Sequence, residues 1–406
     1  MILPVALIDT LEYIDETQTP SPSIVHPCDF TAVINFLKIY DGNNATFESY
    51  RRELERLLQW TWLIVNKSVF ELTREDIEAF IQFCLNPPKQ WISQKRAPRF
   101  IDQNGDRIPN VQWRPFVVKV SKSAHKKAQV ANVNDYQMSQ SSIRALFAVL
   151  GSFYDYLLLE EKITRNPVAM IRQKSRYLQK AQNKKQIIRL SDTQWQACLT
   201  AVEKMACLNP AHERTLFIIT AMYLMYMRIS EFAASDRWIP SMNHFYRDSN
   251  NQWWFKTLGK GNKLREIAVS DAMLKALGRY RQSLGYSALP SPADNIPLIQ
   301  KTKGKGAIES TRQIRRLIQD CFNHAIISLR EKNLAHEADS LESATVHWLR
   351  HTGISDDVNK RGRSIMHVRD DAGHASIVTT EGYSDVELKD RYQSAKHKNT
   401  YINTDE

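Results

Sequence analysis

Residues 215–227 read TLFIITAMYLMYM, a nearly uninterrupted apolar run. A helix that is apolar on every side must be enclosed by other elements of a protein core. The run is too short to cross a bilayer, which takes about 20 apolar residues. We therefore expect this helix to be buried in a sizeable core that the rest of the chain supplies.

Apolar residues recur at helical spacing in the first half of the chain, where they predict a small helical domain. The second of these helices opens with Thr73 and Asp76, which resemble a capping box. The predicted helices cover 44–65, 73–85 and 139–161.

The second half is predicted to be helical with a small sheet, because QWWFKTLGKGNKLREIAVS (252–270) has the pattern strand, glycine-containing turn, strand. Further helices are expected at 271–284, 309–332, 343–360 and 386–396. The predicted fold class is mainly α with a small β-sheet, in two domains. The expected order is an N-terminal arm (1–25), a helical domain (26–175), a basic linker (176–189), a second domain (190–388) and a tail (389–406).

The composition favours a polyanionic partner. The net charge is +11 and the isoelectric point is about 9.3, and soluble proteins this basic commonly bind nucleic acid. The five cysteines are scattered without a CxxC pair, which predicts neither a zinc ribbon nor a disulfide framework and fits a reducing cytosol. The N-terminus lacks the basic flank of a secretory signal, and we expect no membrane span.

Much of the positive charge lies in an insertion at about 87–135. Residues 89–127 contain ten Lys or Arg and only two acidic residues, with Trp91, Phe100, Trp113 and Phe116 interleaved. Such a segment suits phosphate contacts with some aromatic stacking, although a solvated loop is the alternative. The DNA-binding candidates here and in the linker are Lys95, Arg96, Arg99, Arg107, Arg114, Lys119, Lys122, Lys126, Lys127, Arg176, Lys184 and Lys185.

Four short segments carry residues suited to chemistry: MRISE, LGKGNK, HWLRHTG and AGHASIVTTEGY. In this order they resemble the motifs of the tyrosine recombinase, or phage integrase, family over about 190–390. The family pattern is Arg, Lys, His-x-x-Arg, His or Trp, and Tyr. Mapped onto this chain, it gives Arg228, Lys260, His347, Arg350, His374 and Tyr383, with Glu231 as a supporting residue.

The resemblance implies a helical core-binding domain and a catalytic domain that close on DNA as a C-shaped clamp. It also implies that Tyr383 is the nucleophile. Physical chemistry agrees, because metal-free phosphodiester cleavage needs an in-line nucleophile, cationic donors for the phosphate oxygens and an acid for the leaving oxygen. Arg228 and Arg350 suit the oxygens, His347 and His374 add donors, and Lys260 suits the acid. Lys263 is the rival for Lys260, and Tyr392 the rival for Tyr383.

Other functions remain open from the residues. His347 and His351 have the spacing of zinc ligands, but Trp348 occupies the place of the glutamate that a zincin needs. A type IB-like topoisomerase, a chromosome or plasmid dimer resolvase, and a non-catalytic DNA-binding protein are further alternatives. The chain length and the insertion favour a mobile-element integrase.

The resemblance further implies no cofactor or metal, double-stranded DNA sites as substrate, and a homotetramer on DNA in a bacterial cytoplasm. The tail after Tyr383 could dock on a neighbouring subunit or pack on its own domain.

Overall fold

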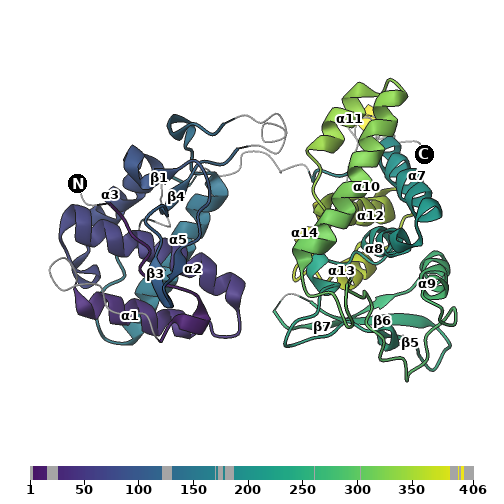
Figure 1. Cartoon of the computed structure of the whole chain (residues 1–406), viewed down its shortest axis with the longest axis horizontal. Coiled ribbons are helices and arrows are strands. Elements are labelled where there is room, and N and C mark those ends of the chain that lie inside the picture. Colours follow the sequence, from purple (N-terminus) through teal and green to yellow (C-terminus); the bar gives the residue numbers. More distant parts are fainter. Residues whose placement is uncertain are drawn as a thin grey trace, which may run out of the picture. The chain divides into compact units, whose positions relative to one another are not determined.

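The structure is a computed structural model that divides into two compact units, Met1–Gln182 and Asn183–Glu406 (Figure 1). The units are described separately below. The residues described are 3–15, 26–120, 130–169, 171, 177–178, 187–259, 261–301, 303–384, 392 and 395–396. Outside these residues lie the segment TQTPSPS, most of the linker, and most of the predicted helix at 386–396 and of the tail.

The first unit is a helical domain. Its helices are α1 (Pro27–Lys38), α2 (Asn44–Trp60), α3 (Arg74–Leu85) and α5 (Gln140–Leu159). A π-helical turn, Thr61–Val65, continues α2, and short 3₁₀ turns cover Leu11–Tyr13, Val69–Glu71, Lys89–Trp91 and Val133–Asp135. The predicted capping box is confirmed, because the Thr73 side chain accepts from the Asp76 amide and the Asp76 side chain accepts from the Thr73 amide.

α5 is the one helix of the described residues that is long and apolar enough to cross a membrane by length and composition. Half of its apolar window is buried, and Leu146, Leu150, Phe153 and Leu157 are fully enclosed in the core of the first unit. Core helices of soluble domains pass the same test, so this helix is explained by its packing.

The insertion contains the predicted hairpin. Strands β2 (Phe100–Gln103) and β3 (Asp106–Pro109) pair antiparallel across Asn104 and Gly105. Both turn residues have positive φ, which is the backbone that an Asn-Gly hairpin turn requires. A second, two-stranded parallel sheet pairs β1 (Ile92–Ser93) with β4 (Phe116–Val117).

The expectation of a separate N-terminal arm is wrong for the described residues 3–15. Leu7, Ile8 and Ile14 are buried in the core of the first unit. The amides of Leu7 and Ile8 donate to the Glu55 carboxylate, and Arg51 donates to the Asp9 carbonyl. Apolar burial and these hydrogen bonds together hold residues 3–15 on the first unit.

The second unit is mainly helical, with one small sheet, so the predicted fold class is confirmed. Its helices are α7 (Asp192–Leu208), α8 (Glu213–Leu224), α9 (Asp271–Ser283), α10 (Thr311–Glu331), α11 (Ala335–Glu342), α12 (His347–Asn359), α13 (Ile365–Ala372) and α14 (Ile377–Glu381). Short 3₁₀ turns cover Pro210–His212, Ile229–Glu231 and Met242–His244.

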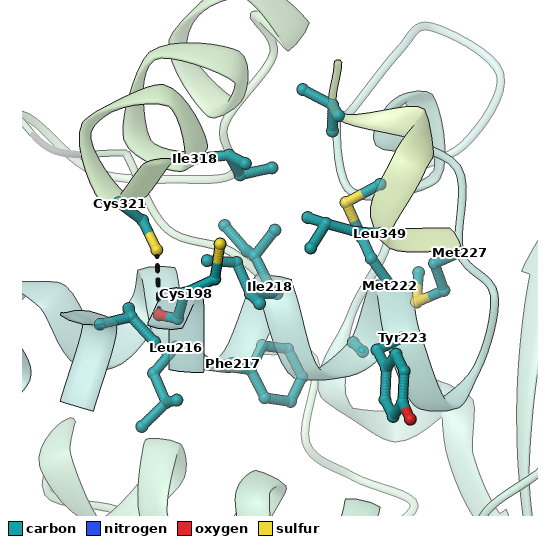
Figure 2. Packing of buried hydrophobic residues seen from close by; sticks show 14 of the residues in the cluster. Cys198, Leu216, Phe217, Ile218, Met222, Tyr223, Met227, Ile318, Cys321 and Leu349 are labelled. Atoms are coloured by element: carbon teal, nitrogen blue, oxygen red, sulfur yellow. Dashed lines mark hydrogen bonds between the residues drawn. The ribbon is translucent and has the colours of Figure 1, made fainter. Parts of the chain in front are cut away.

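The apolar run of the sequence forms α8, at the centre of this unit. Figure 2 shows Phe217, Ile218 and Met222 of α8 among side chains from α7, α10 and α12. All three are at most 1% exposed. The thiol of Cys321 on α10 donates to the Cys198 carbonyl of α7 at 3.3 Å, and all five cysteines are free.

The sheet has three antiparallel strands in the order β5 (Phe245–Arg247), β6 (Trp253–Leu258) and β7 (Leu264–Ala268). The predicted strand–turn–strand unit is therefore confirmed, with one strand more than expected. That strand, β5, lies in the segment SMNHFYRDSN (241–250). The strand occupies part of the interval between Arg228 and Lys260.

Candidate active site

The site depends on a close approach of α12 to α8. A Cβ added at Gly353 would lie 1.9 Å from the carbonyl oxygen of Tyr223, so any side chain there would collide with backbone. Glycine at this position lets α12 carry His347, Arg350 and His351 against the end of α8. The segment HWLRHTG thus includes a packing requirement that we did not predict.

The helix α8 ends sooner than predicted, and this places Arg228 outside it. The last α8 residue is Leu224, and Tyr226 has a positive φ of 52° with its side chain fully buried. Arg228 then lies in extended backbone, before a 3₁₀ turn that contains Glu231. The left-handed Tyr226 therefore redirects the chain, so that Arg228 and Glu231 follow α8 and are not part of it.

Arg350 is almost fully buried and donates to neutral groups. Its guanidinium donates to the Tyr226 carbonyl, to the Ala372 carbonyl at 2.6 Å and to His374 Nε2 at 3.2 Å. Burial, and then the charges of Arg228 and Arg265, lower the pKa of Arg350 to about 9. Arg350 is therefore still protonated at neutral pH.

Arg228 shares an acceptor with Arg350. Its Nη2 donates to the carbonyls of Ala372 and Gly373 at 3.4 and 3.2 Å. Its Nη1 pairs with Glu231 Oε1 at 3.0 Å, and the other oxygen of Glu231 pairs with Arg265 at 2.6 Å. As expected, Glu231 holds Arg228 in place. The structure adds a second arginine to the same carboxylate, which leaves this group of side chains net positive.

His374 has a defined tautomer. Because arginine has no acceptor, Nε2 of His374 accepts from Arg350 and Nδ1 carries the proton. Nδ1 then donates to Thr380 Oγ1 at 2.9 Å. Burial, followed by the charge of Arg350, lowers the pKa of His374 to about 4, which agrees with a neutral ring.

Tyr383 is buried, with 4% of its surface exposed. Its hydroxyl lies 2.6 Å from His351 Nδ1, and its ring stacks on His374 at a centroid distance of 5.8 Å. Asn359 of α12 donates to the Tyr383 carbonyl at 2.8 Å. Side chains of α12 therefore hold Tyr383 in place.

Burial raises the pKa of the Tyr383 hydroxyl, and the charges of Arg350 and Arg228 oppose this. The two arginines are therefore near enough to Tyr383 to stabilise its anion. His347 is exposed at the start of α12, and partial desolvation, followed by the charge of Arg350, lowers its pKa. It is therefore a neutral donor or acceptor at neutral pH.

Lys260 lies outside the described residues, but the residue before it is located. A Cβ added at Gly259 would lie 3.8 Å from Arg228 Nη1 and 3.3 Å from the Lys263 carbonyl oxygen. The β6–β7 turn therefore begins beside Arg228. The rival Lys263 is exposed.

Two residues at this site were not predicted to act there. His351 entered the sequence analysis only as a possible zinc ligand, and Arg265 was not singled out. His351 lies in HWLRHTG, directly after Arg350, and Arg265 lies in GKGNKLREIAV, after the β6–β7 turn. Within the described residues no group of three His, Cys, Asp or Glu side chains could hold a metal ion.

The basic insertion differs from the expectation in its aromatic residues. Trp91 and Phe116 are fully buried and Trp113 is only 7% exposed. The prediction that bases stack on these three rings is therefore wrong. Trp91 and Phe116 fill the domain core because the short strands and turns of the insertion offer it an apolar face.

The predicted DNA-binding arginines of the insertion have partners within the first unit. Arg99 pairs with Glu55, and Arg107 pairs with Asp9 and Asp102. Arg114 donates to the carbonyls of Gln90, Val111 and Trp113. Three of the other candidates are exposed: Lys95, Arg96 and Lys119. Outside the described residues lie Lys122, Lys126, Lys127, Arg176, Lys184 and Lys185.

Comparison with known proteins settles the family. A model of the phage integrase family matches residues 188–389, which span the whole constellation from Arg228 to Tyr383. The chain belongs to this family. Curated tyrosine recombinases are similar to it over most of their length. XerD of Staphylococcus saprophyticus is 24% identical over 255 residues, covering 63% of this chain and 75% of that protein. XerC of Actinobacillus pleuropneumoniae is 25% identical over 263 residues, covering 64% and 72%.

Solved tyrosine recombinases share the fold. XerH recombinase bound to a palindromic difH substrate, in a post-cleavage complex, gives a TM-score of 0.54 at 14% identity and covers 95% of this chain and 92% of that chain. A singly substituted form of the integrase of transposon Tn1549, bound to circular-intermediate DNA, gives 0.51 at 14% identity and covers 90% and 98%. This chain is thus a tyrosine recombinase by family and by fold.

Proposed function

We propose that this chain is a site-specific recombinase that cleaves and rejoins DNA through a 3′-phosphotyrosyl intermediate on Tyr383. The observation that carries the proposal is a convergence. Arg228, Arg350, His374 and Tyr383 come from segments up to 155 positions apart, yet hydrogen bonds and ring stacking link them into one cluster. A structural role alone would not need these residue types together.

In the proposed reaction, Tyr383 Oη attacks phosphorus and the bond to the 5′-oxygen breaks. Arg228 and Arg350 donate to the non-bridging oxygens, where their charge is worth most as the transition state forms. Arg350 and Nη2 of Arg228 donate to the carbonyls of Ala372 and Gly373, which are neutral and do not offset charge, while Nη1 of Arg228 pairs with Glu231. Lys260 gives a proton to the leaving oxygen.

The phosphotyrosyl bond conserves the energy of the phosphodiester, so a 5′-hydroxyl can reverse the step without ATP. We infer from the family resemblance that four protomers act on two duplex sites in the cytoplasm, on nucleoid DNA. The chain length and its insertion favour integration or excision of a mobile element over dimer resolution. A topoisomerase would share the chemistry but need no second duplex.

The test is to trap the covalent adduct with a nicked suicide DNA library and to read it on a denaturing gel. Wild type and Tyr392→Phe should form the adduct in excess EDTA, while Tyr383→Phe should bind DNA without forming it. Tyr392 is a matched control because it is 66% exposed, close in sequence and of the same residue type. Adduct formation by Tyr383→Phe, or no adduct from the wild type, would overturn the proposal.

A further inference from the structure

His351 is the side chain that meets the reacting atom of the proposed nucleophile. Its Nδ1 lies 2.6 Å from Tyr383 Oη, within hydrogen-bond distance, and the two ring centroids are 5.5 Å apart. A candidate general base must lie within about 2.6–3.2 Å of the group whose proton it removes. His351 meets this condition in the structure as it stands.

The other histidine beside Tyr383 cannot take its proton. His374 stacks nearly parallel to the tyrosine ring, at 15°, and both of its nitrogens are committed, to Arg350 and to Thr380. His374 is therefore placed to orient the tyrosine. This leaves His351 as the neighbour with a ring nitrogen directed at Oη.

Burial and the charges around His351 keep its ring neutral. The groups that face it are His347 and Arg350 on its own helix, and Tyr383 and His374 from the segment packed on that helix. Burial, then His347, then Arg350, lower the pKa of His351 to about 4. The ring is therefore neutral at neutral pH, and in the tautomer that carries its proton on Nε2 the Nδ1 atom accepts from Tyr383. An incoming phosphate would offset the positive charge of Arg350 that disfavours the imidazolium.

We propose that His351 is the general base of strand cleavage, an inference that rests on Tyr383 being the nucleophile. As the Oη–P bond forms and the P–O5′ bond breaks, the hydroxyl proton passes from Oη to Nδ1. The leaving oxygen takes its proton from Lys260. In the reverse step the 5′-hydroxyl attacks phosphorus, the imidazolium returns its proton to Oη and Lys260 recovers its own. Atoms and charges balance in both directions.

The matched variants separate proton transfer from positioning. His351→Asn keeps an acceptor oxygen near the place of Nδ1 but cannot hold the proton, and His351→Ala removes both. Single-turnover adduct formation on suicide DNA should slow about 10²-fold or more in both variants, with DNA binding retained. Added imidazole should restore part of the rate to His351→Ala. Wild-type speed in His351→Asn would overturn the proposal and leave His351 a positioning residue.

A substrate with sulfur in place of the bridging 5′-oxygen shows on which side of phosphorus His351 acts. A thiolate leaves without an acid, so the substrate should rescue Lys260→Ala but not His351→Asn. Rescue of His351→Asn would overturn the base assignment. Failure of the proposed function gives a different result, since then wild type forms no adduct or Tyr383→Phe forms one.

Discussion

Arg99 and Arg107 of the first unit and Arg350 of the second have opposite surroundings. In the first unit, Arg99 pairs with buried Glu55 and Arg107 pairs with Asp9, so carboxylates neutralise them. In the second, the described hydrogen bonds of Arg350 go to carbonyls and a neutral imidazole. An arginine held by neutral groups keeps its charge for an incoming anion, whereas one whose charge is neutralised by carboxylates is committed to structure. Arg228 lies between these cases, because its Nη1 pairs with Glu231 while its Nη2 donates to neutral carbonyls. The partner therefore tells more about function than the number of basic residues.

The largest expected effect tests this difference in chemistry. Arg350→Ala should slow adduct formation by about 10²–10³-fold, because it removes a donor to the charge that develops on phosphate. Arg107→Ala should leave the rate close to that of wild type. The measurement is single-turnover cleavage of suicide DNA at saturating enzyme. An equal loss of cleavage rate in both variants would contradict the difference proposed between Arg350 and Arg107.

The next effect tests the structural role of the first unit's pairs. Glu55→Gln should destabilise that unit by about 3 kcal/mol, because it leaves Arg99 buried without its counter-charge and weakens the bonds to Leu7 and Ile8. Hydrogen exchange of α2 and α5 amides in the intact protein would report it. Exposed Lys95→Ala serves as control and should change stability by less than about 0.5 kcal/mol. An unchanged exchange rate in Glu55→Gln would contradict the buried pair.

A smaller effect tests the packing that supports the active site. Gly353→Ala should cost about 1–3 kcal/mol, because its Cβ meets the Tyr223 carbonyl. Gly278→Ala is the matched control, since that helical glycine has only ordinary contacts at 3.5 Å, and alanine should be neutral or stabilising there. Urea unfolding, monitored by hydrogen exchange of the α8 and α12 amides, measures the stability of the second unit in both variants. Equal stability of both variants would contradict the close approach.

These variants also show what the sequence could and could not predict. The resemblance to the family's motifs was enough to select Arg228, Arg350, His374 and Tyr383, and the structure links these four side chains. The basic insertion was interpreted from its charge and its interleaved aromatic residues. Charge carries no information about partners, and the partners Asp9 and Glu55 lie far away in the sequence.

The end of a helix and the burial of a side chain were hard to predict where tertiary contacts override the hydrophobic pattern of the sequence. The apolar run predicts a helix through Met227, yet the left-handed Tyr226 ends α8 early and turns Arg228 toward the site. The burial of Tyr383 is another such case, because its polar neighbours in sequence hide the contacts with His351 and Asn359 that enclose it.

The smallest effect concerns DNA affinity. Replacing the exposed Lys95, Arg96 and Lys119 by alanine should reduce the slope of log affinity against log salt by up to about 3, since each lost phosphate contact contributes about 0.9. Arg107→Ala should leave that slope unchanged. The measurement is binding to cognate DNA between low and moderate salt. The reverse pattern would mean that the paired arginine contacts DNA and the exposed residues do not.

The central claim is that Tyr383 becomes covalently linked to DNA. Tryptic cleavage of the trapped adduct gives a peptide, residues 370–389, in which Tyr383 is the only tyrosine, while Tyr392 falls in a separate peptide. After nuclease digestion, mass spectrometry should find a nucleotide remnant, joined through its 3′-phosphate, on the 370–389 peptide. A remnant on the peptide of Tyr392, or on any other residue, would contradict the account.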